Sequence, residues 1–262
     1  MQIWNGQIRF TGSVTLSGTQ GNDTLTGGRG NDSINGGSGS DALSGGGGND
    51  TLSGGLGNDS LDGGTGKDEL QEIGDVNFKL TNTALTGLGT DTLKSNTIET
   101  ARLTGGAGNN RLDASGFTLG SVTLDGGDGN DVLLGGSKND SLSGGAGHDL
   151  LIGGTGADLL SGNSGDDILI GGTVTPAINT SAALTSIMAE WTRVGSLSMR
   201  QAHLLNGGGL NGTNRLNSTT VVNDANAKDS LSGGDDTDWF FQSAGDVLLD
   251  FRLEIGDIKS VA

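Results

Sequence analysis

A repeat of nine residues constrains the fold of this chain more than any other feature. Six copies follow one another over residues 18–71, and five more cover residues 126–170. The first block reads GTQGNDTLT, GGRGNDSIN, GGSGSDALS, GGGGNDTLS, GGLGNDSLD and GGTGKDELQ, and the second reads GGDGNDVLL, GGSKNDSLS, GGAGHDLLI, GGTGADLLS and GNSGDDILI. A short, fixed period is typical of solenoids, in which each repeat packs only against its neighbours. The sequence therefore predicts a solenoid.

The last three positions of each repeat place one large apolar residue between small residues. This pattern predicts a short β-strand that turns one side chain inward. The predicted core is therefore a thin ladder of Leu25, Ile34, Leu43, Leu52, Leu61, Leu70, Leu133, Leu142, Leu151, Leu160 and Leu169.

The first six positions combine glycines with an aspartate at the sixth. Glycine lets the backbone turn sharply or approach a ligand, which leaves carbonyl oxygens free for an ion. Oxygen-only, flexible coordination suits Ca²⁺, whereas the strict octahedron of Mg²⁺ fits less well. The predicted ligands are the carboxylates of Asp23, Asp32, Asp41, Asp50, Asp59, Asp68, Asp131, Asp140, Asp149, Asp158 and Asp167, and the carbonyls of Gly28, Gly30, Gly37, Gly39, Gly46, Gly48, Gly55, Gly57, Gly136, Gly145, Gly147, Gly154 and Gly156. Asp229 and Asp238 are predicted as weaker ligands in degenerate repeats.

The charge of the chain also favours bound cations. Acidic residues outnumber basic ones by 31 to 14, and only 32% of residues are hydrophobic, a combination typical of disorder. A disordered glycine-rich linker would share this composition, but it would not keep Asp and Leu in phase over eleven copies. The chain contains no cysteine, so bound metal rather than disulfides is expected to stabilise the fold. The net charge of −17 also argues against a nucleic-acid partner.

The pattern G-G-x-G-x-D-x-U-x, where U is large and apolar, resembles the RTX (repeats in toxin), or haemolysin-type, calcium-binding nonapeptide repeat. The resemblance implies a right-handed parallel β-roll in which two nonapeptides form one coil and aspartates 18 residues apart share an ion. The implied pairs are Asp23–Asp41, Asp32–Asp50, Asp41–Asp59, Asp50–Asp68, Asp131–Asp149, Asp140–Asp158 and Asp149–Asp167. About seven Ca²⁺ ions, within a range of about four to ten, would offset about 14 of the excess negative charges.

The same resemblance implies export by a type I secretion system and an extracellular location, where the chain would fold on meeting calcium. An extracellular or cell-surface partner is compatible with this interpretation, but the sequence does not identify one. Three repeats depart from the pattern and are expected to bind calcium weakly or not at all. They carry Lys138 in place of the third glycine, Asn163 in place of the second, and a single initial glycine at Gly18. A further degenerate repeat has Asn110 at the aspartate position, where poor binding or none is expected.

Five segments follow from the pattern. Between the two blocks we expect larger, metal-free coils rather than a small inserted domain. After the second block, residues 180–194 place Leu184, Ile187, Met188 and Trp191 on one helical face, and residues 197–205 predict a second helix. The segments are residues 1–17 (leading strand or N-terminal cap), 18–71 (first block), 72–125 (irregular coils), 126–173 (second block) and 174–262 (C-terminal helix-containing cap with degenerate repeats).

Other functions are less well supported. With two histidines, no cysteine and no tyrosine, the chain lacks most parts of a catalytic site, so no enzyme is predicted. The sequence GGGLNG at residues 207–212 lacks the strand–turn–helix context of a dinucleotide site. No stretch approaches the roughly 18 apolar residues of a membrane span. Two alternatives stay open: a module of a larger secreted adhesin or enzyme, and a calcium-dependent ice- or surface-binding protein.

Overall fold

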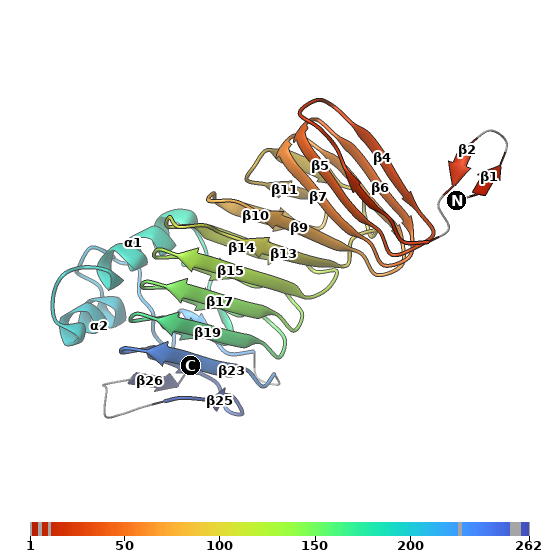
Figure 1. The fold of residues 1–262 in the computed structure, drawn as a ribbon. Coiled ribbons are helices and arrows are strands. Elements are labelled where there is room, and N and C mark those ends of the chain that lie inside the picture. Colours follow the sequence, from red (N-terminus) through yellow and green to blue (C-terminus); the bar gives the residue numbers. More distant parts are fainter. Residues whose placement is uncertain (1, 5–6, 10–11, 225–226, 252–257, 262) are drawn as a thin grey trace.

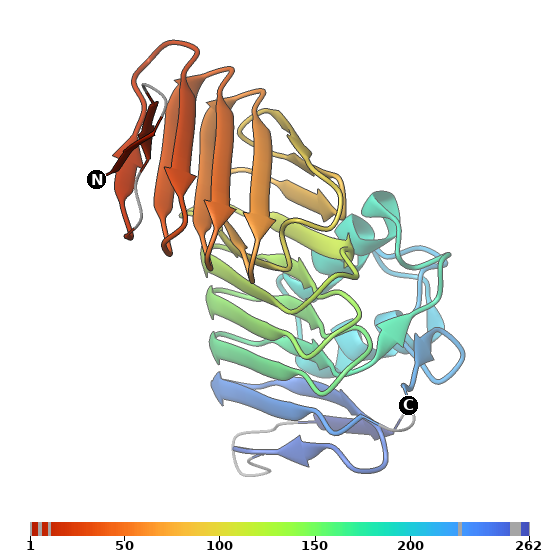
Figure 2. The ribbon, with the colours of Figure 1, turned by 90° about the vertical axis from the view of Figure 1, so that its right-hand side faces the viewer.

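The computed structural model describes residues 2–4, 7–9, 12–224, 227–251 and 258–261. Within these residues the strands build a parallel β-solenoid of about 13 turns, with two short helices near the C-terminal end. Successive strands lie side by side along a long stack (Figures 1 and 2). The all-β solenoid predicted from the nine-residue period is confirmed. Part of the expected leading segment, residues 1, 5–6 and 10–11, lies outside the described residues.

Two long sheets form the walls of the solenoid. The larger sheet has twelve described strands: β4 (Thr24–Gly28), β6 (Ala42–Gly47), β8 (Ser60–Thr65), β10 (Phe78–Thr81), β11 (Ala84–Thr86), β12 (Thr90–Leu93), β14 (Arg111–Gly116), β16 (Val132–Leu134), β18 (Leu150–Ile152), β20 (Ile168–Ile170), β24 (Trp239–Gln242) and β26 (Ile258–Val261). The smaller sheet has ten: β3 (Thr15–Ser17), β5 (Ser33–Gly39), β7 (Thr51–Gly57), β9 (Glu69–Ile73), β13 (Thr100–Thr104), β15 (Val122–Asp128), β17 (Ser141–Ala146), β19 (Leu159–Ser164), β23 (Ser230–Asp235) and β25 (Val247–Leu248). Two antiparallel pairs of strands lie outside these sheets: β1 (Gln2–Trp4) with β2 (Gln7–Arg9), and β21 (Thr173–Val174) with β22 (Val221–Val222).

The register shows that two nonapeptides make one coil. Leu25 of β4 pairs with Leu43 of β6, and Leu142 of β17 pairs with Leu160 of β19. Each pair is 18 residues apart, so the apolar residue of one coil lies on that of the next. Alternate repeats therefore contribute to opposite walls, as the family resemblance implies.

The inward apolar residues form the predicted ladder. From Ile34 to Leu70, and again from Leu133 to Leu169, the predicted members are at most 2% exposed, while Leu25 near the end of the stack is partly buried. Burial of one such side chain contributes roughly 1.5–3 kcal/mol. A ladder one residue wide per wall is a thin core, so the turns need a further source of stability.

The solenoid continues through residues 72–125. In the larger sheet, β8 pairs in parallel with β12, β12 and β11 pair antiparallel, β11 and β10 pair antiparallel, and β10 pairs in parallel with β14. In the smaller sheet, β13 pairs in parallel with both β9 and β15. Phe78, Leu80, Leu85 and Phe117 fill this wider region. Both walls are therefore continuous between the two blocks.

Residues 174–224 leave the solenoid as an arm that lies along the side of the stack (Figures 1 and 2). The arm contains α1 (Ser181–Trp191), whose N-cap is Thr180, and α2 (Leu197–Asn206), whose N-cap is Ser196. Both helices agree with the sequence prediction, and the four residues of the predicted apolar face of α1 are buried. The chain then rejoins the stack at β23, which pairs with β19. The segment expected as a single C-terminal cap thus comprises this arm and further coils.

The arm covers the outer face of the larger sheet. Strands β16, β18, β20 and β24 carry apolar side chains that point outward as well as inward. Trp191 of α1 packs on Trp239 of β24 with ring centroids 5.9 Å apart. Arg200 of α2 donates to Asp166 Oδ2 at 2.9 Å and lies over the Trp191 ring. An apolar contact and an ion pair therefore both hold the arm on the solenoid.

Candidate metal centres

The repeat aspartates form rows along the turns of the solenoid. In each predicted pair, one oxygen of the later aspartate accepts the main-chain N–H of the aspartate 18 residues earlier, at 2.7–2.8 Å. The structure thus brings together all seven pairs that the sequence placed side by side. The rows continue after the arm, because Asp229 Oδ1 accepts from Asp158 N at 2.8 Å and Asp238 Oδ1 accepts from Asp167 N at 3.0 Å.

The second oxygen of most of these carboxylates has no hydrogen-bond partner although it is buried. This holds for Oδ2 of Asp32, Asp41, Asp50, Asp59, Asp68, Asp131, Asp149, Asp158, Asp167 and Asp229. Among the described residues, no lysine, arginine or histidine forms an ion pair with any of them. A buried carboxylate without a partner is costly, so these oxygens require a cation or a proton.

Burial raises the pKa of eight of these carboxyl groups: Asp50, Asp59, Asp68, Asp131, Asp149, Asp158, Asp167 and Asp229. The pKa of Asp149 rises from 3.8 to about 7 because burial disfavours the charged form, and the Asp131 carboxylate adds to the shift. Burial likewise raises the pKa of Asp158 to about 8, with further contributions from Asp140 and Asp229. Ordinary acidic surface groups would not behave in this way. Without a cation, these groups therefore take up protons in the folded chain near neutral pH, and their negative charge destabilises the fold at higher pH.

The first glycine of each repeat lies at the unpartnered oxygen. A Cβ atom on Gly27 would overlap Asp32 Oδ2 and would lie 2.6 Å from the carbonyl oxygen of Gly45, one coil further on. The same arrangement recurs at Gly36, where Asp41 Oδ2 and the Gly54 carbonyl are the neighbours. Sequence reasoning singled out the glycines at the second and fourth positions of the repeat and missed the glycine at the first position. The signal was present, because the first position is glycine in all eleven repeats.

The glycines predicted as ligands, at the second and fourth positions of the repeat, have a clear conformational role. All of them except Gly30 and Gly136 have positive φ. Asn163, which replaces a second glycine, also has a positive φ of 79°, a conformation that asparagine tolerates better than most residues. In this repeat Asp167 Oδ2 is still unpartnered, so the substitution keeps the regular geometry. That the carbonyls of these glycines bind an ion stays a prediction.

The donor atoms fit calcium. Each turn offers carboxylate and carbonyl oxygens, without sulfur or nitrogen ligands, and the carboxylates lack counter-charges. Among the described residues, no three His, Cys, Asp or Glu side chains converge into a cluster that could hold a metal ion. Main-chain oxygens would therefore have to complete the coordination of any ion in these turns.

In three degenerate turns, a side-chain oxygen at the aspartate position accepts a main-chain hydrogen bond from within the same repeat. Asp140 Oδ2, in the repeat with Lys138, accepts from Gly136 N at 2.6 Å. Asp23 Oδ2 accepts from Thr19 N at 2.6 Å. Asn110 Oδ1 accepts from Gly106 N at 2.8 Å. An oxygen that already accepts a main-chain hydrogen bond is less available to a metal ion, which gives a physical reason for the weak binding expected in these repeats.

This difference predicts unequal effects for two isosteric substitutions. Asp149→Asn keeps the acceptor for Asp131 N but removes an unpartnered anionic oxygen, so we expect the calcium midpoint of folding to rise by about tenfold, or about 1.4 kcal/mol. Asp23→Asn should leave the midpoint within about twofold, because its amide oxygen can keep the hydrogen bond from Thr19 N. Calcium titration followed by circular dichroism measures both, and equal shifts would contradict the distinction.

Two acidic residues of the irregular coils also join the rows, and sequence reasoning missed them. Asp91 Oδ1 accepts from Asp59 N at 3.0 Å, and Glu99 Oε2 accepts from Asp68 N at 2.9 Å. Residues 89–94, GTDTLK, match the second half of a repeat, which was the available signal for Asp91. Nothing comparable precedes Glu99. The expectation that these coils are metal-free stays a prediction, but acidic side chains occupy the same positions there.

A parallel solenoid with buried, unpartnered carboxylates at its turns defines the class of calcium-binding β-rolls. The profile of the RTX calcium-binding nonapeptide repeat matches residues 15–43, 36–70, 102–116, 125–160 and 143–173. The chain belongs to this family of repeats. These repeats bind calcium, and the β-roll that they form has a structural role. No curated protein matches the chain. None of the helices in the described residues is long and apolar enough to cross a membrane.

Proposed function

We propose that this chain is an exported structural module that folds when it binds calcium outside the cell. The observation that carries the proposal is the series of buried aspartate oxygens without partners, which calcium would supply. At low cytosolic calcium, repulsion between these carboxylates would keep the chain extended during export. The family resemblance favours a type I secretion system as the export route. The roll itself is a calcium-binding structural module of a type that is not typically catalytic, and we propose no enzymatic activity for it.

The proposed ligands are the repeat aspartates together with carbonyls of the turn glycines, for about seven ions. The strongest sites would lie where both neighbouring aspartates keep an unpartnered oxygen, as in Asp32 with Asp50 and Asp149 with Asp167. Sites that include Asp23 or Asp140 would be weaker. Asp229 would extend one row beyond the second block, since it contacts Asp158 in the same manner.

Calcium at these sites would supply the stability that the thin core lacks. Extracellular calcium sites have Kd values on the order of 10⁻⁴–10⁻³ M. Calcium at about ten times Kd stabilises a folded state by roughly 1.4 kcal/mol per site. About seven sites would then contribute on the order of 10 kcal/mol, which is comparable with the stability of a whole domain.

A pair of alanine substitutions in the first block tests this assignment. Asp50→Ala removes a residue that contacts both Asp32 and Asp68, whereas Asp23→Ala removes one that contacts only Asp41 along its row. We expect Asp50→Ala to raise the calcium midpoint by about tenfold or more, and Asp23→Ala by no more than about threefold. Circular dichroism during calcium titration gives the midpoints. Equal midpoints for the two variants would count against shared ions between neighbouring coils.

A further inference from the structure

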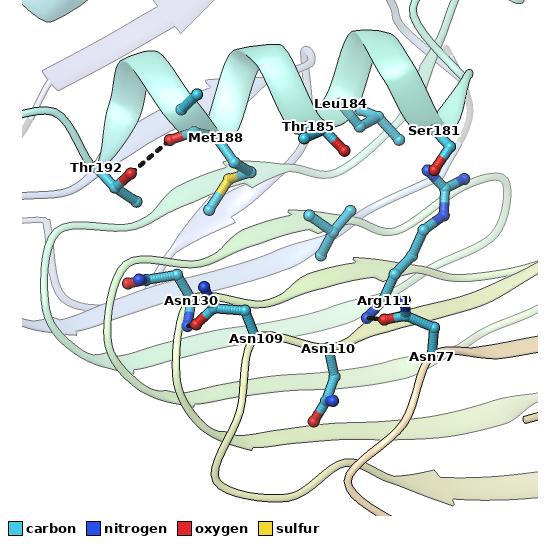
Figure 3. Close-up of a pocket in the computed structure, with 12 residues that line it drawn as sticks. Asn77, Asn109, Asn110, Arg111, Asn130, Ser181, Leu184, Thr185, Met188 and Thr192 are labelled. Carbon is cyan, nitrogen blue, oxygen red and sulfur yellow. Dashed lines mark hydrogen bonds between the residues drawn. The ribbon is translucent and has the colours of Figure 1, made fainter. Parts of the chain in front are cut away.

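A pocket lies between α1 and the turns beneath it, outside the rows of aspartates (Figure 3). Its volume is about 360 Å³. The floor is formed by Asn77, Asn109, Asn130 and Arg111 of the solenoid. The roof is formed by α1 and includes Leu184, Thr185, Met188 and Ala189. Ser181 and Thr192 also line the pocket, so it has a mainly polar floor and a roof that combines apolar and hydroxyl side chains.

Hydrogen bonds between coils fix the orientation of the floor amides. Asn77 Oδ1 accepts from Arg111 N at 2.7 Å, Asn109 Oδ1 accepts from Asn130 N at 2.8 Å, and Asn130 Oδ1 accepts from His148 N at 2.8 Å. Because each carbonyl oxygen is engaged, each side-chain NH₂ group must point the other way. No protein acceptor contacts these NH₂ groups in the described part of the chain. The floor thus offers a row of hydrogen-bond donors.

Arg111 adds a further donor at one end of this row. Its Nη2 donates to Asp113 Oδ2 at 2.8 Å, while its Nη1 is buried and has no hydrogen-bond partner. Figure 3 shows the guanidinium extending from the floor toward Ser181, at the start of α1. The Asp113 carboxylate balances the Arg111 charge, so the floor is rich in donors without carrying net positive charge. A ligand for this pocket therefore needs many acceptor oxygens but no strong negative charge.

The helix makes this site different from other turns with the same amides. Asn31 and Asn49 form the same inter-coil hydrogen bonds in the first block, but neither lines this pocket. In this pocket, apolar side chains of α1 lie opposite such a row. A sugar ring has both required surfaces, because its hydroxyl groups accept hydrogen bonds and its C–H face packs on apolar side chains. We propose that this pocket binds a saccharide of one or two units.

The test uses the calcium-loaded full chain and three probes: glucose, galactose and glucuronate at millimolar concentration. Saturation-transfer NMR should detect binding of at least one of them. Ala189→Trp fills the pocket and should abolish the transfer, whereas Ala182→Trp alters an exposed residue of the same helix that does not line the pocket and should preserve it. Circular dichroism confirms that each variant folds.

A second variant tests the donor row without changing the shape of the pocket. Asn109→Asp keeps the acceptor for Asn130 N but removes the NH₂ donor, so affinity should fall by about tenfold. Asn49→Asp makes the same change in the first block, where the side-chain oxygen accepts from Lys67 N, and should leave affinity unchanged. Binding of glucuronate alone would contradict the proposal, because it would show that the carboxylate rather than the sugar hydroxyl groups is recognised. Absence of binding by all three sugars, or binding that survives both pocket variants, would overturn it.

Discussion

Removal of calcium is expected to unfold the solenoid at neutral pH. Metal-stripped protein should show the far-ultraviolet circular dichroism of a coil, because the buried carboxylates of each row repel one another without a counter-charge. Calcium in the sub-millimolar to millimolar range should restore the β signal in one cooperative transition. The expected difference in the free energy of unfolding is on the order of 10 kcal/mol, which exceeds that of any single substitution considered above.

Magnesium is the control for this experiment. It demands strict octahedral geometry and keeps its water ligands, so magnesium at the same concentration should leave the stripped chain unfolded. A chain that is already folded in chelator would show that calcium does not drive folding. In that case the apolar ladder and the arm would have to supply the stability, and the proposal of calcium-triggered folding would be wrong.

Much of this arrangement could be predicted because the nine-residue period determines which residues lie next to one another in neighbouring coils. A coil of two nonapeptides brings every eighteenth residue into contact, so phase alone places Leu52 on Leu70 and Asp32 beside Asp50. The two helices were predictable because the apolar spacing of α1 is that of a helix with one buried face. Both patterns are local in sequence or fixed by a constant repeat length.

The missed features depend on loops of irregular length. Asp91 and Glu99 lie 32 and 31 residues from their row neighbours, because the β10–β11–β12 hairpins lengthen the coil. Asp229 was predicted as a weaker ligand, but its pairing with Asp158 was not, because the arm separates the two by 71 residues. Periodicity cannot show that such residues return to the same row. The pairing of β12 with β8, of β13 with β9 and of β23 with β19 places them there.

The covered face of the larger sheet was also missed, although a signal was present. In the second block, alternate repeats end in VLL, LLI and ILI, and the degenerate repeat ends in WFF, whereas the intervening repeats end in polar residues such as SLS. Since alternate repeats form one wall, these endings mark a single wall with apolar side chains on both faces. Such a wall requires a cover, and the apolar face of α1 provides it.

Lowering the pH is expected to stabilise the metal-free fold and so to replace part of the effect of calcium. This is the second large effect that we expect on folding. The pKa values of Asp149 and Asp158 rise in the folded chain from 3.8 to about 7 and about 8. A carboxyl group with a raised pKa binds its proton more tightly when the chain is folded, so lowering the pH stabilises the metal-free fold. This gain begins as the pH falls through about 8 and is complete below the unfolded pKa near 4.

Metal-stripped protein should therefore be coil-like at pH 8 and recover β signal by about pH 5, which is still above the isoelectric point of about 4.2. Calcium should behave in the opposite sense, because protons compete for the same oxygens, and its stabilising effect should shrink over the same window. Asp158→Asn removes one buried charge, so its metal-free form should recover β signal at a higher pH than the parent chain. Circular dichroism of stripped protein at fixed pH values, with light scattering to detect aggregation, measures these changes. A stripped chain whose β content is the same at pH 8 and pH 5 would show that the aspartate rows do not control folding.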